Sequence, residues 1–596
     1  MEPPKDPIER KSLEQRDRMS DLQRLRHSCA HIMATAVTRL WPDARLDIGP
    51  PTDDGFYYDF DLASHRFSTD DFAKIEEEMK KVVKENQPFE KSIKTRDEAR
   101  AFFESRGQNF KVERLADIPE GEPISFYQNG EFIDLCAGPH VMRTGNVKAF
   151  KLLRVASAYY RGNEANPQLQ RLYGTAFPNK TELEAWITAQ EEARKRDHRK
   201  IGKEMGLFTL SPLVGPGLVL WMPKGGVIRV ELQKLMQEEL VKRRYQPVFT
   251  PHIGSIELYK ISGHFPFYKD SQYPTIKDPD GAEYLLKPMN CPHHIQIYAA
   301  EPRSYRDLPI RLAEFGTVYR YEQSGELCGM TRVRGLTQDD AHLFCTPEQV
   351  EQEFVSTVEL VQTIFRVLGL TDYRVQVSVR DPKSDKYTGD PKIWDQAEAT
   401  LKKVAQDMRL PSQVVEGEAA FYGPKLDFMV KDCIGREWQL GTVQLDYNLP
   451  ERFKLEYVGA DNQRHRPVMI HRAPFGSFER FVGILIEHFA GNFPLWLAPE
   501  QVRVLPIGET QNEYARSVSE ELRAGGVRAE ADLSGDKIGG KIRNAEKDKV
   551  HTMLIVGQKE QDSGAVAVRL HGKGDQGAKP RGEVIAQIIA DIKERR

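Results

Sequence analysis

The sequence predicts an α/β protein built from several domains. Its 596 residues are too many for a single hydrophobic core, so more than one domain is expected. Hydrophobic residues make up 40% and charged residues 29% of the chain, which is typical of soluble globular proteins. From residue 498 on, strand-like apolar runs alternate with helix-like runs, and this alternation predicts a mainly parallel sheet covered by helices.

The chain begins with a polar segment and a domain of mixed pattern. Residues 1–17 are polar and charged, they lack the apolar core of a signal peptide, and we expect them to form a disordered leader. Residues 18–183 predict an α+β domain. Its expected helices span 22–41 and 68–85, and its expected strands lie around 55–60 and 125–136. The charged segment 184–204 predicts one connecting helix, whose basic run is better explained by a solvated face than by nucleic-acid binding.

The central part, residues 205–497, contains three closely spaced arginines. Arg320 follows the apolar run 315–319, and Arg332 and Arg334 lie in the alternating sequence TRVRGLTQ, so a long hairpin with its return strand over that sequence is expected. Guanidinium groups this close need anions, and the planar fork of arginine suits bidentate phosphate binding. The segment therefore indicates a polyanionic ligand, although a surface hairpin with solvated charges is an alternative.

A second segment, HRAPFGSFER at 471–480, strengthens the case for an anion site. Gly476 and Ser477 lie at the expected start of an apolar helix, and Arg480 lies in its first turn. Free N–H groups and the helix dipole favour an anion at such a helix N-terminus. An arginine in that turn opposes the dipole, which suggests that its side chain serves a ligand.

These two segments resemble motifs 2 and 3 of the class II aminoacyl-tRNA synthetases. The matching residues are Tyr319, Arg320 and Glu322 for motif 2, Gly476, Glu479 and Arg480 for motif 3, and the segment 227–251 with Pro251 for motif 1. Further segments, among them TRVRGLTQDDAH, LKPMNCPHH, FYGPKLDF and WQLGTVQLD, resemble the threonyl-tRNA synthetase family in the right order, over roughly residues 18–596.

The resemblance implies a threonine–tRNA ligase of bacterial type with three domains. These are an α+β editing domain, a class II catalytic domain on an antiparallel sheet, and a C-terminal α/β anticodon-binding domain at 498–596. ATP with Mg²⁺, L-threonine and tRNA(Thr) are the implied substrates, and catalysis would be mainly positioning and charge stabilisation. The implied catalytic residues are Arg320, Arg480 and Lys425. The implied substrate- and ATP-binding residues are Met289, Glu322, Arg332, Gln338, Asp340, Tyr422, Gln439, Thr442, Gln444 and Ser477.

A zinc site is also implied. Cys291, His342 and His471 are too far apart in sequence for their spacing to nominate them, and three unrelated residues would otherwise be the simpler interpretation. They fall where synthetases of this family hold Zn²⁺. A thiolate and two imidazoles suit zinc, and three ligands leave a position open for threonine, whose amine Asp340 would hold.

Four residues of the first domain form an HxxxH and CxxxH set. His27 and His31 share one face of the expected helix, and Cys136 and His140 form the second pair. On spacing alone the set fits a zinc site. Core histidines are another alternative, which fits poorly because the neighbours of His27 and His31 are charged or small.

The resemblance implies a different role for this set, namely an editing pocket without metal. The reaction would be hydrolysis of Ser-tRNA(Thr), and a deprotonated histidine, cysteine or lysine could orient or activate water. The pocket would admit serine and exclude threonine by its extra methyl group, as the second step of a double sieve. Further residues implied to line the pocket are Lys111, Tyr127 and Asp134.

Anticodon contacts are implied for Glu560 and Arg569. Residues 501–596 contain 17 Lys and Arg against 15 Asp and Glu, a mild basic bias in a chain with a net charge of −3. Gly535 stands where many relatives have an asparagine, so the details of anticodon reading are expected to differ.

The expected assembly is a cytoplasmic homodimer that pairs through motif 1. Six cysteines without a CxxC pattern favour reduced thiols in the cytosol, and no apolar run reaches the length of about 18 residues that a membrane span needs. Many bacterial relatives begin with a small additional domain, at whose place only residues 1–17 stand here. Two alternatives are a free-standing editing protein, which would lack the arginine motifs, and a synthetase-like regulatory protein, whose catalytic residues usually decay.

Overall fold

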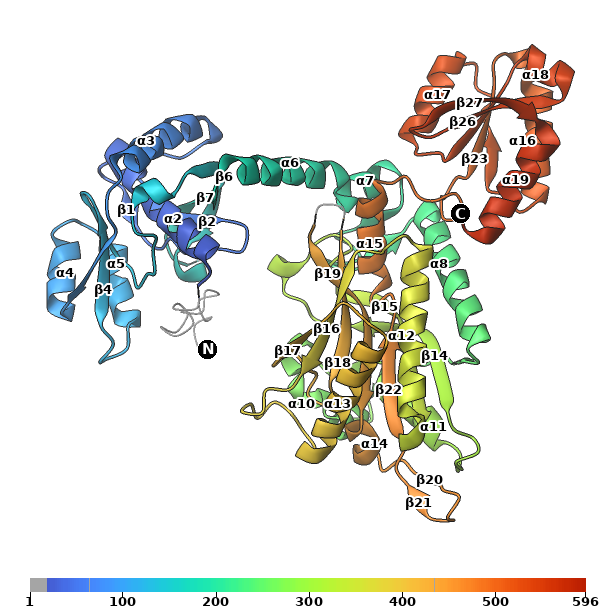
Figure 1. Ribbon diagram of the computed structural model, residues 1–596, viewed down its shortest axis with the longest axis horizontal. Helices are drawn as coiled ribbons and strands as arrows, with labels where there is room; N and C mark the ends of the chain where they lie inside the picture. The colour runs from blue at the N-terminus through green and yellow to red at the C-terminus, as the bar shows by residue number, and fades with distance from the viewer. Residues whose placement is uncertain (1–18, 64, 164, 433–434) are drawn as a thin grey trace. The chain divides into compact units, whose positions relative to one another are not determined.

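The computed structural model describes residues 19–596 except residues 64, 164, 433 and 434, so the leader expected at 1–17 lies outside the described residues. The chain forms two compact units, the first ending at Glu191 and the second beginning at Glu192 (Figure 1). None of the described helices has the length and apolar character that a membrane crossing requires.

An antiparallel sheet and one long helix form the core of the first unit. The strands, in order, are β1 (Arg45–Leu46), β2 (Phe56–Asp61), β7 (Gln168–Phe177) and β6 (Ala149–Tyr159). Helix α2 (Asp21–Leu40) begins after Ser20, which forms a capping box with Gln23. Met33 of α2 and Tyr58 of the sheet belong to one buried cluster, so the expected first helix is fixed against the sheet.

A second, smaller sheet completes this unit. It pairs β3 with β4 and β4 with β5, so the strands expected around 125–136 form a hairpin. The sheet and the helices near it are β3 (Glu90–Lys94), β4 (Ile124–Asn129), β5 (Phe132–Leu135), α4 (Arg96–Glu104) and α5 (Asn109–Arg114), and α3 (Phe72–Glu85) contacts α2.

The connecting segment forms two helices, so the expectation of a single helix over 184–204 is wrong. α6 (Lys180–Arg196) and α7 (His198–Glu204) are separated by Asp197, whose φ of −50° and ψ of 118° are not helical. The Asp197 carboxylate accepts a hydrogen bond of 2.8 Å from the Arg199 backbone N–H. A residue that caps a new helix in this way takes an extended conformation, which ends the helix before it.

An eight-stranded sheet forms the centre of the second unit. Its strands, in order, are β10 (Gln246–Pro247), β14 (Ile310–Tyr319), β15 (Gly335–Cys345), β22 (Val468–Ala473), β19 (Glu437–Asp446), β18 (Lys425–Lys431), β16 (Tyr373–Val379) and β17 (Ser412–Glu416). The five inner pairs are antiparallel and the two edge pairs are parallel, which confirms the expected antiparallel-sheet domain. The helices that share its main buried cluster are α7, α8 (Pro223–Lys242), α12 (Val350–Val367), α13 (Pro391–Asp407) and α15 (Phe478–Phe489).

The expected long hairpin lies in this sheet, but its return strand begins later than expected. β14 and β15 pair from Ile310 opposite Phe344 to Tyr319 opposite Gly335. The Arg334 backbone N–H donates to the Gly217 carbonyl at 2.7 Å, outside the ladder. Residues 331–334 therefore belong to the connecting loop, which places Arg320, Arg332 and Arg334 outside the strands.

Short helices and strands surround the eight-stranded sheet. They are β8 (Phe208–Leu210), β9 (Val219–Trp221), β11 (Ile253–Ser255), α9 (Ile256–Ser262), α10 (His264–Phe267), β12 (Ile276–Lys277), β13 (Glu283–Leu286), α11 (Cys291–Ala299), α14 (Asn448–Arg452), β20 (Tyr457–Val458) and β21 (Arg464–His465).

The last sheet is parallel only in part. Its strands, in order, are β24 (Ala529–Ala531), β23 (Val502–Pro506), β25 (Thr552–Val556), β26 (Ala565–Leu570) and β27 (Gly574–Pro580), with α16 (Asn512–Ala524), α17 (Ile538–Lys547), α18 (Gln558–Ser563) and α19 (Arg581–Glu594). The expectation of a mainly parallel sheet holds for β24, β23 and β25, while β26 and β27 are antiparallel. Parallel pairing needs a crossover of a dozen or more residues, and the connections before β26 and β27 are too short.

Candidate active sites

One face of the central sheet carries a row of polar side chains. The strand register aligns Lys425, Gln444, His471 and His342 across β18, β19, β22 and β15. Residues directly opposite each other in antiparallel strands point to the same face. Asp340 lies two residues before His342 and therefore points the same way.

The structure brings the three expected metal ligands together. Cys291 is the first residue of α11, and His342 and His471 face each other on β15 and β22. One ligand atom from each lies within 4.8 Å of the others, and all three residues are buried. His471 Nε2 lies 2.9 Å from the Asp446 carboxylate, to which it donates, so Nδ1 is the unprotonated nitrogen of the neutral ring. A thiol, two imidazoles and an orienting carboxylate fit Zn²⁺.

Burial controls the protonation of this cluster. It raises the pKa of the Cys291 thiol well above its ordinary value, and the charges of Asp340 and Asp446 raise it further. Burial also lowers the pKa of His342 well below its ordinary value. His264, whose Nε2 lies 3.7 Å from the Cys291 Sγ, has its pKa lowered to about 3, again mainly by burial. The imidazoles of His342 and His264 are therefore neutral, as a metal ligand must be.

The expected phosphate-binding arginines lie close enough to affect one another. Arg480 donates from Nε to the Thr331 carbonyl at 3.0 Å, which ties α15 to the loop between β14 and β15. Burial lowers the pKa of Arg480, and the charges of Arg320 and Arg332 lower it further. Arg320 also points an Nη2 at the sulfur of Met289, 3.7 Å away. Guanidinium groups that repel each other in a partly buried place favour a bound anion.

The expected helix start behind these arginines is confirmed. α15 begins at Phe478, and the Ser477 hydroxyl caps it by accepting from the Arg480 backbone N–H at 3.3 Å. The backbone of Gln338 forms an isolated bridge with Ser477, which brings that strand residue to the helix N-terminus.

Glu322 and Arg332 are paired with each other. Arg332 Nε donates to the Glu322 carboxylate at 2.9 Å, and its Nη2 lies 3.1 Å from a Glu326 oxygen. Arg334 Nε donates to the Glu322 carbonyl at 2.9 Å. A nucleotide that used Glu322 or Arg332 would have to replace these contacts.

A residue that sequence reasoning missed, Asp427, holds several expected substrate-binding side chains. Its carboxylate forms an ion pair with Lys425 and accepts from Gln439 at 2.6 Å and from Thr442 at 3.0 Å. Its only signal in the sequence is its place two residues after Lys425, which puts both on one face of a strand.

Tyr422 and Gln444 lie beside the metal cluster. The Tyr422 ring is 5.4 Å from the His471 ring, and burial raises the pKa of its hydroxyl well above the ordinary value. Gln444 donates to the Gly423 carbonyl at 3.2 Å.

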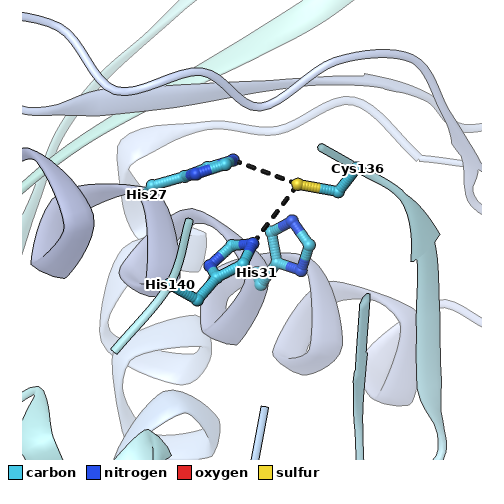
Figure 2. A group of neighbouring side chains, drawn as sticks. All are labelled: His27, His31, Cys136 and His140. Carbon is cyan, nitrogen blue, oxygen red and sulfur yellow. Dashed lines mark hydrogen bonds between the residues drawn. The ribbon is translucent and has the colours of Figure 1, made fainter. Parts of the chain in front are cut away.

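Four side chains of the first unit converge on one point, as Figure 2 shows. His27 and His31 come from α2, and Cys136 and His140 follow β5. The Cys136 Sγ lies 3.4 Å from His27 Nε2 and 3.3 Å from His140 Nε2. The HxxxH and CxxxH residues thus form a single cluster.

Neighbouring groups determine the tautomers of two of these histidines. His27 Nδ1 donates to the Pro139 carbonyl at 3.1 Å. The Ser28 hydroxyl gives its proton to the Arg24 carbonyl at 2.8 Å, so His140 Nδ1, 3.1 Å from that hydroxyl, must donate to it. Both Nε2 atoms are therefore unprotonated in the neutral rings and face the thiol. Such lone pairs can accept a proton from water or from a substrate hydroxyl.

A buried ionic network lies next to this cluster. Lys111 Nζ is 2.5 Å from an Asp134 oxygen and 3.1 Å from the hydroxyl of Tyr58, which in turn donates to Asp134. Burial and the Lys111 charge lower the pKa of His31 to about 3. Sequence reasoning missed Tyr58, which looks like an ordinary core residue in the apolar strand FYYDF.

Tyr127 lies at the edge of the Cys–His₃ cluster, whereas Glu560 and Arg569 lie in the domain of the last sheet. The Tyr127 ring is 4.5 Å from the His140 ring. Glu560 accepts from the Gly557 backbone N–H at 3.0 Å and so caps α18, while Arg569 on β26 lies 3.7 Å from a Glu546 oxygen. Glu560 and Arg569 thus each have a partner within their own domain.

Family models match three parts of the chain. Residues 124–173 match the "threonyl and alanyl tRNA synthetase second additional domain", residues 273–489 the "tRNA synthetase class II core domain (G, H, P, S and T)", and residues 501–591 the "anticodon binding domain". The first match lies in the first unit and includes strands of both its sheets, the second contains all of the eight-stranded sheet except β10, and the third contains the last sheet.

Whole proteins match as well. A threonine–tRNA ligase of Thermus thermophilus is 54% identical, with 96% of this chain and 89% of that protein covered, and one of Gloeobacter violaceus is 53% identical, with 96% and 93% covered. The solved RNA binding domain of threonyl-tRNA synthetase from Cryptosporidium parvum Iowa II is 37% identical, with a TM-score of 0.63 and 66% and 98% covered. A prolyl-tRNA synthetase from the same organism is similar in fold, with a TM-score of 0.53, 15% identity, and 67% and 77% covered.

Proposed function

The chain belongs to the threonine–tRNA ligase family, and from this membership we propose that it activates L-threonine with ATP, transfers it to tRNA(Thr) and hydrolyses Ser-tRNA(Thr). The observation that carries the proposal is the presence, in one chain, of a Cys–His–His cluster on the central sheet and a separate Cys–His₃ cluster in the first unit. The first suits selection of a hydroxyl amino acid and the second suits hydrolysis.

Activation is assigned to the arginines and to the row of side chains around Lys425. Arg320 and Arg480 would neutralise the phosphates of Mg²⁺–ATP, with Arg332 adding charge once it leaves Glu322. Glu322 would then be free to recognise the adenine, as the family resemblance implies. The threonine carboxylate attacks the α-phosphate in line, so the residues act by positioning and by stabilising charge.

We assign Zn²⁺ to Cys291, His342 and His471. Bound there, it would offer open coordination positions to the amino and hydroxyl groups of threonine. Asp340, beside His342, would hold the amine. Valine lacks the hydroxyl and would be rejected strongly, whereas serine lacks only a methyl group, which is worth about 1–3 kcal/mol. A site of this kind therefore needs a second, hydrolytic step against serine.

That step is assigned to the first unit. The unprotonated Nε2 atoms of His27 and His140 would accept protons from the attacking water or hold the serine hydroxyl, and Cys136 lies between them. His31, Lys111, Tyr127 and Asp134 would shape the pocket, which admits serine and excludes the larger threonine.

The proposal also covers tRNA recognition, assembly and cellular location. We assign anticodon recognition to the last sheet, including Glu560 and Arg569, and homodimer formation to motif 1. The five cysteines among the described residues form no disulfide, which supports a cytoplasmic location. We assign the domain bounds 18–183, 205–497 and 498–596, each of which contains one family match, with 184–204 as the segment that connects the first two.

Amino-acid-dependent ATP–pyrophosphate exchange, run with all twenty amino acids and with and without a zinc chelator, tests the activation step. We expect strong exchange with threonine, weak exchange with serine, none with valine, and loss of exchange after chelation. Absence of exchange with every amino acid would overturn the ligase proposal. Exchange that survives complete removal of zinc would overturn the metal assignment alone.

A further inference from the structure

A second buried histidine lies directly behind the expected zinc ligand His342. His294, on α11, is fully buried, and its Nδ1 lies 2.7 Å from the Nδ1 of His342. The two rings are nearly perpendicular, with centroids 4.6 Å apart. Two ring nitrogens at this distance share one proton, so one of them donates and the other accepts.

Glu314 occupies the far side of His294. Its carboxylate lies 3.2 Å from His294 Nε2 and also accepts from the Thr250 backbone N–H at 3.1 Å and the Thr250 hydroxyl at 2.7 Å. Lys287 Nζ lies 3.5 Å away. Burial alone would raise the pKa of Glu314, but these hydrogen bonds and the Lys287 charge lower it to about 2. The carboxylate is therefore ionised and can only accept.

The direction of each hydrogen bond follows from that carboxylate. Because Glu314 can only accept, His294 Nε2 carries a proton, and Nδ1 is the acceptor in the ring form that carries a single proton. His342 Nδ1 then donates to it, which leaves His342 Nε2 as the nitrogen with a lone pair for a metal. His471 is oriented in the same manner by Asp446, but there the carboxylate bonds the ligand directly.

We propose that Glu314 and His294 are positioning residues that hold His342 in the tautomer and orientation required for metal binding. This inference rests on the proposed zinc site, but none of the family motifs quoted above assigns a role to either residue. Outer partners of this kind usually change metal affinity by about 10–100-fold when they are removed.

Zinc affinity of the full chain, measured by competition with a chromophoric chelator, tests the proposal. In Glu314→Gln the amide can donate to His294 Nε2, which moves the proton of the His294 ring to Nδ1. The N–H groups of His294 Nδ1 and His342 Nδ1 would then point at each other. We expect this variant and His294→Leu to bind zinc about 10–100-fold more weakly. His294→Asn keeps an acceptor at the position of Nδ1 and should bind zinc nearly as well as the wild type.

His293→Leu is the matched control. His293 precedes His294 on the same helix, and its Nε2 forms a hydrogen bond of 2.9 Å with the Tyr259 hydroxyl and not with one of the three proposed metal-binding residues. The absorption spectrum of the Co²⁺-loaded proteins gives a second readout, which should change in His294→Leu but not in His293→Leu. If Glu314→Gln fails to fold because Lys287 loses its partner, the zinc affinities of His294→Leu, His294→Asn and His293→Leu still test the positioning role. A wild type that binds no zinc would overturn the metal assignment itself. A wild type that binds zinc no more tightly than His294→Leu would overturn only the positioning role.

Discussion

Asp427 accepts hydrogen bonds from Gln439 and Thr442, pairs with Lys425 and is almost fully buried. An asparagine in its place offers one acceptor oxygen and no charge, so Lys425 would lose its partner. We predict that Asp427→Asn lowers kcat/KM for threonine-dependent ATP–pyrophosphate exchange at least tenfold, a loss of about 1.4 kcal/mol in transition-state binding. Asp461→Asn, on an exposed turn, is the control, and equal rates for both variants would contradict the prediction.

His27 turns an unprotonated Nε2 toward the Cys136 thiol, and its removal should affect hydrolysis alone. We predict that His27→Ala slows deacylation of preformed Ser-tRNA(Thr) by about 10²-fold or more, the usual contribution of a proton-transferring group. Threonine-dependent exchange should stay unchanged, because His27 belongs to the first unit. His65→Ala, in the same unit but paired with Asp71, should edit normally. A normal deacylation rate in His27→Ala would remove His27 from the reaction.

The two sites differ in how far their residues could be predicted. His27 with His31, and Cys136 with His140, are each four residues apart, so local spacing exposes them. Cys291, His342 and His471 could be nominated only through the family resemblance, because the fold and not their spacing brings them together. Tyr58 lies in none of the quoted family segments, and Asp427 and His294 lie in FYGPKLDF and LKPMNCPHH, which assign them no role, so only their contacts show what they do.

At the level of elements, α7 joins the loop of motif 2 to helix α15. The buried His198 donates from Nδ1 to Glu487 at 2.7 Å and accepts at Nε2 from the Met330 backbone N–H at 3.0 Å. A Cβ on Gly329 would come within 2.2 Å of the His198 ring, so only glycine permits this approach. The junction supports the Thr331 carbonyl that Arg480 contacts.

Glu487 makes this junction sensitive to acid. Burial alone would raise its pKa, but the hydrogen bond from His198 and the charge of Arg436 hold the pKa below its ordinary value of 4.5. A depressed carboxyl pKa stabilises the folded state fully above about pH 4.5, and this contribution is lost as the pH falls below 4.5 and through the lower pKa of the folded state. Glu487→Gln has no such contribution to lose.

We therefore predict that Glu487→Gln is less stable than the wild type by about 1–3 kcal/mol at pH 7, and that the difference shrinks toward pH 4. Thermal unfolding at several pH values measures it, and the KM for ATP should rise in the same variant. Glu301→Gln, at an exposed position, serves as the control. Wild-type and Glu487→Gln curves that stay parallel from pH 7 to 4 would contradict the assignment.

Helices with a long apolar repeat were predicted correctly. Boundaries that depend on a single polar contact were not. α2, α3, α15, α16 and α19 follow from periodicity. The break at Asp197 depends on one carboxylate that caps the next helix, and the late start of β15 depends on the bond from Arg334 to Gly217. β26 and β27 are antiparallel to their neighbours because the connections before them are short. An alternation of strands and helices in the sequence does not show this.

At the scale of the whole molecule, large apolar side chains are exposed around the first motif of the second unit. They are Leu210, Leu213, Val214, Leu220, Met222, Val230, Val241 and Phe249, on β8, β9, α8 and the segments next to them. Leu213 is 99% and Val241 75% exposed, and exposed apolar side chains that group on one surface are typical of a protein–protein interface. A symmetric dimer would use this same surface on both copies.

We predict that the wild type has twice the chain mass of 68.1 kDa in solution and that Leu213→Asp or Val241→Asp shifts it toward the monomer. A carboxylate buried at a dimer interface without a partner costs several kcal/mol, enough to weaken association by two or more orders of magnitude. Light scattering behind size-exclusion chromatography at low micromolar concentration gives the mass.

Ile93→Asp is the control, because Ile93 is 65% exposed but lies in the first unit, away from motif 1 in sequence. If both variants keep the dimer mass while remaining folded, the dimer forms through another surface. A monomeric wild type would leave these apolar residues without the partner that their exposure implies and would overturn the dimer proposal.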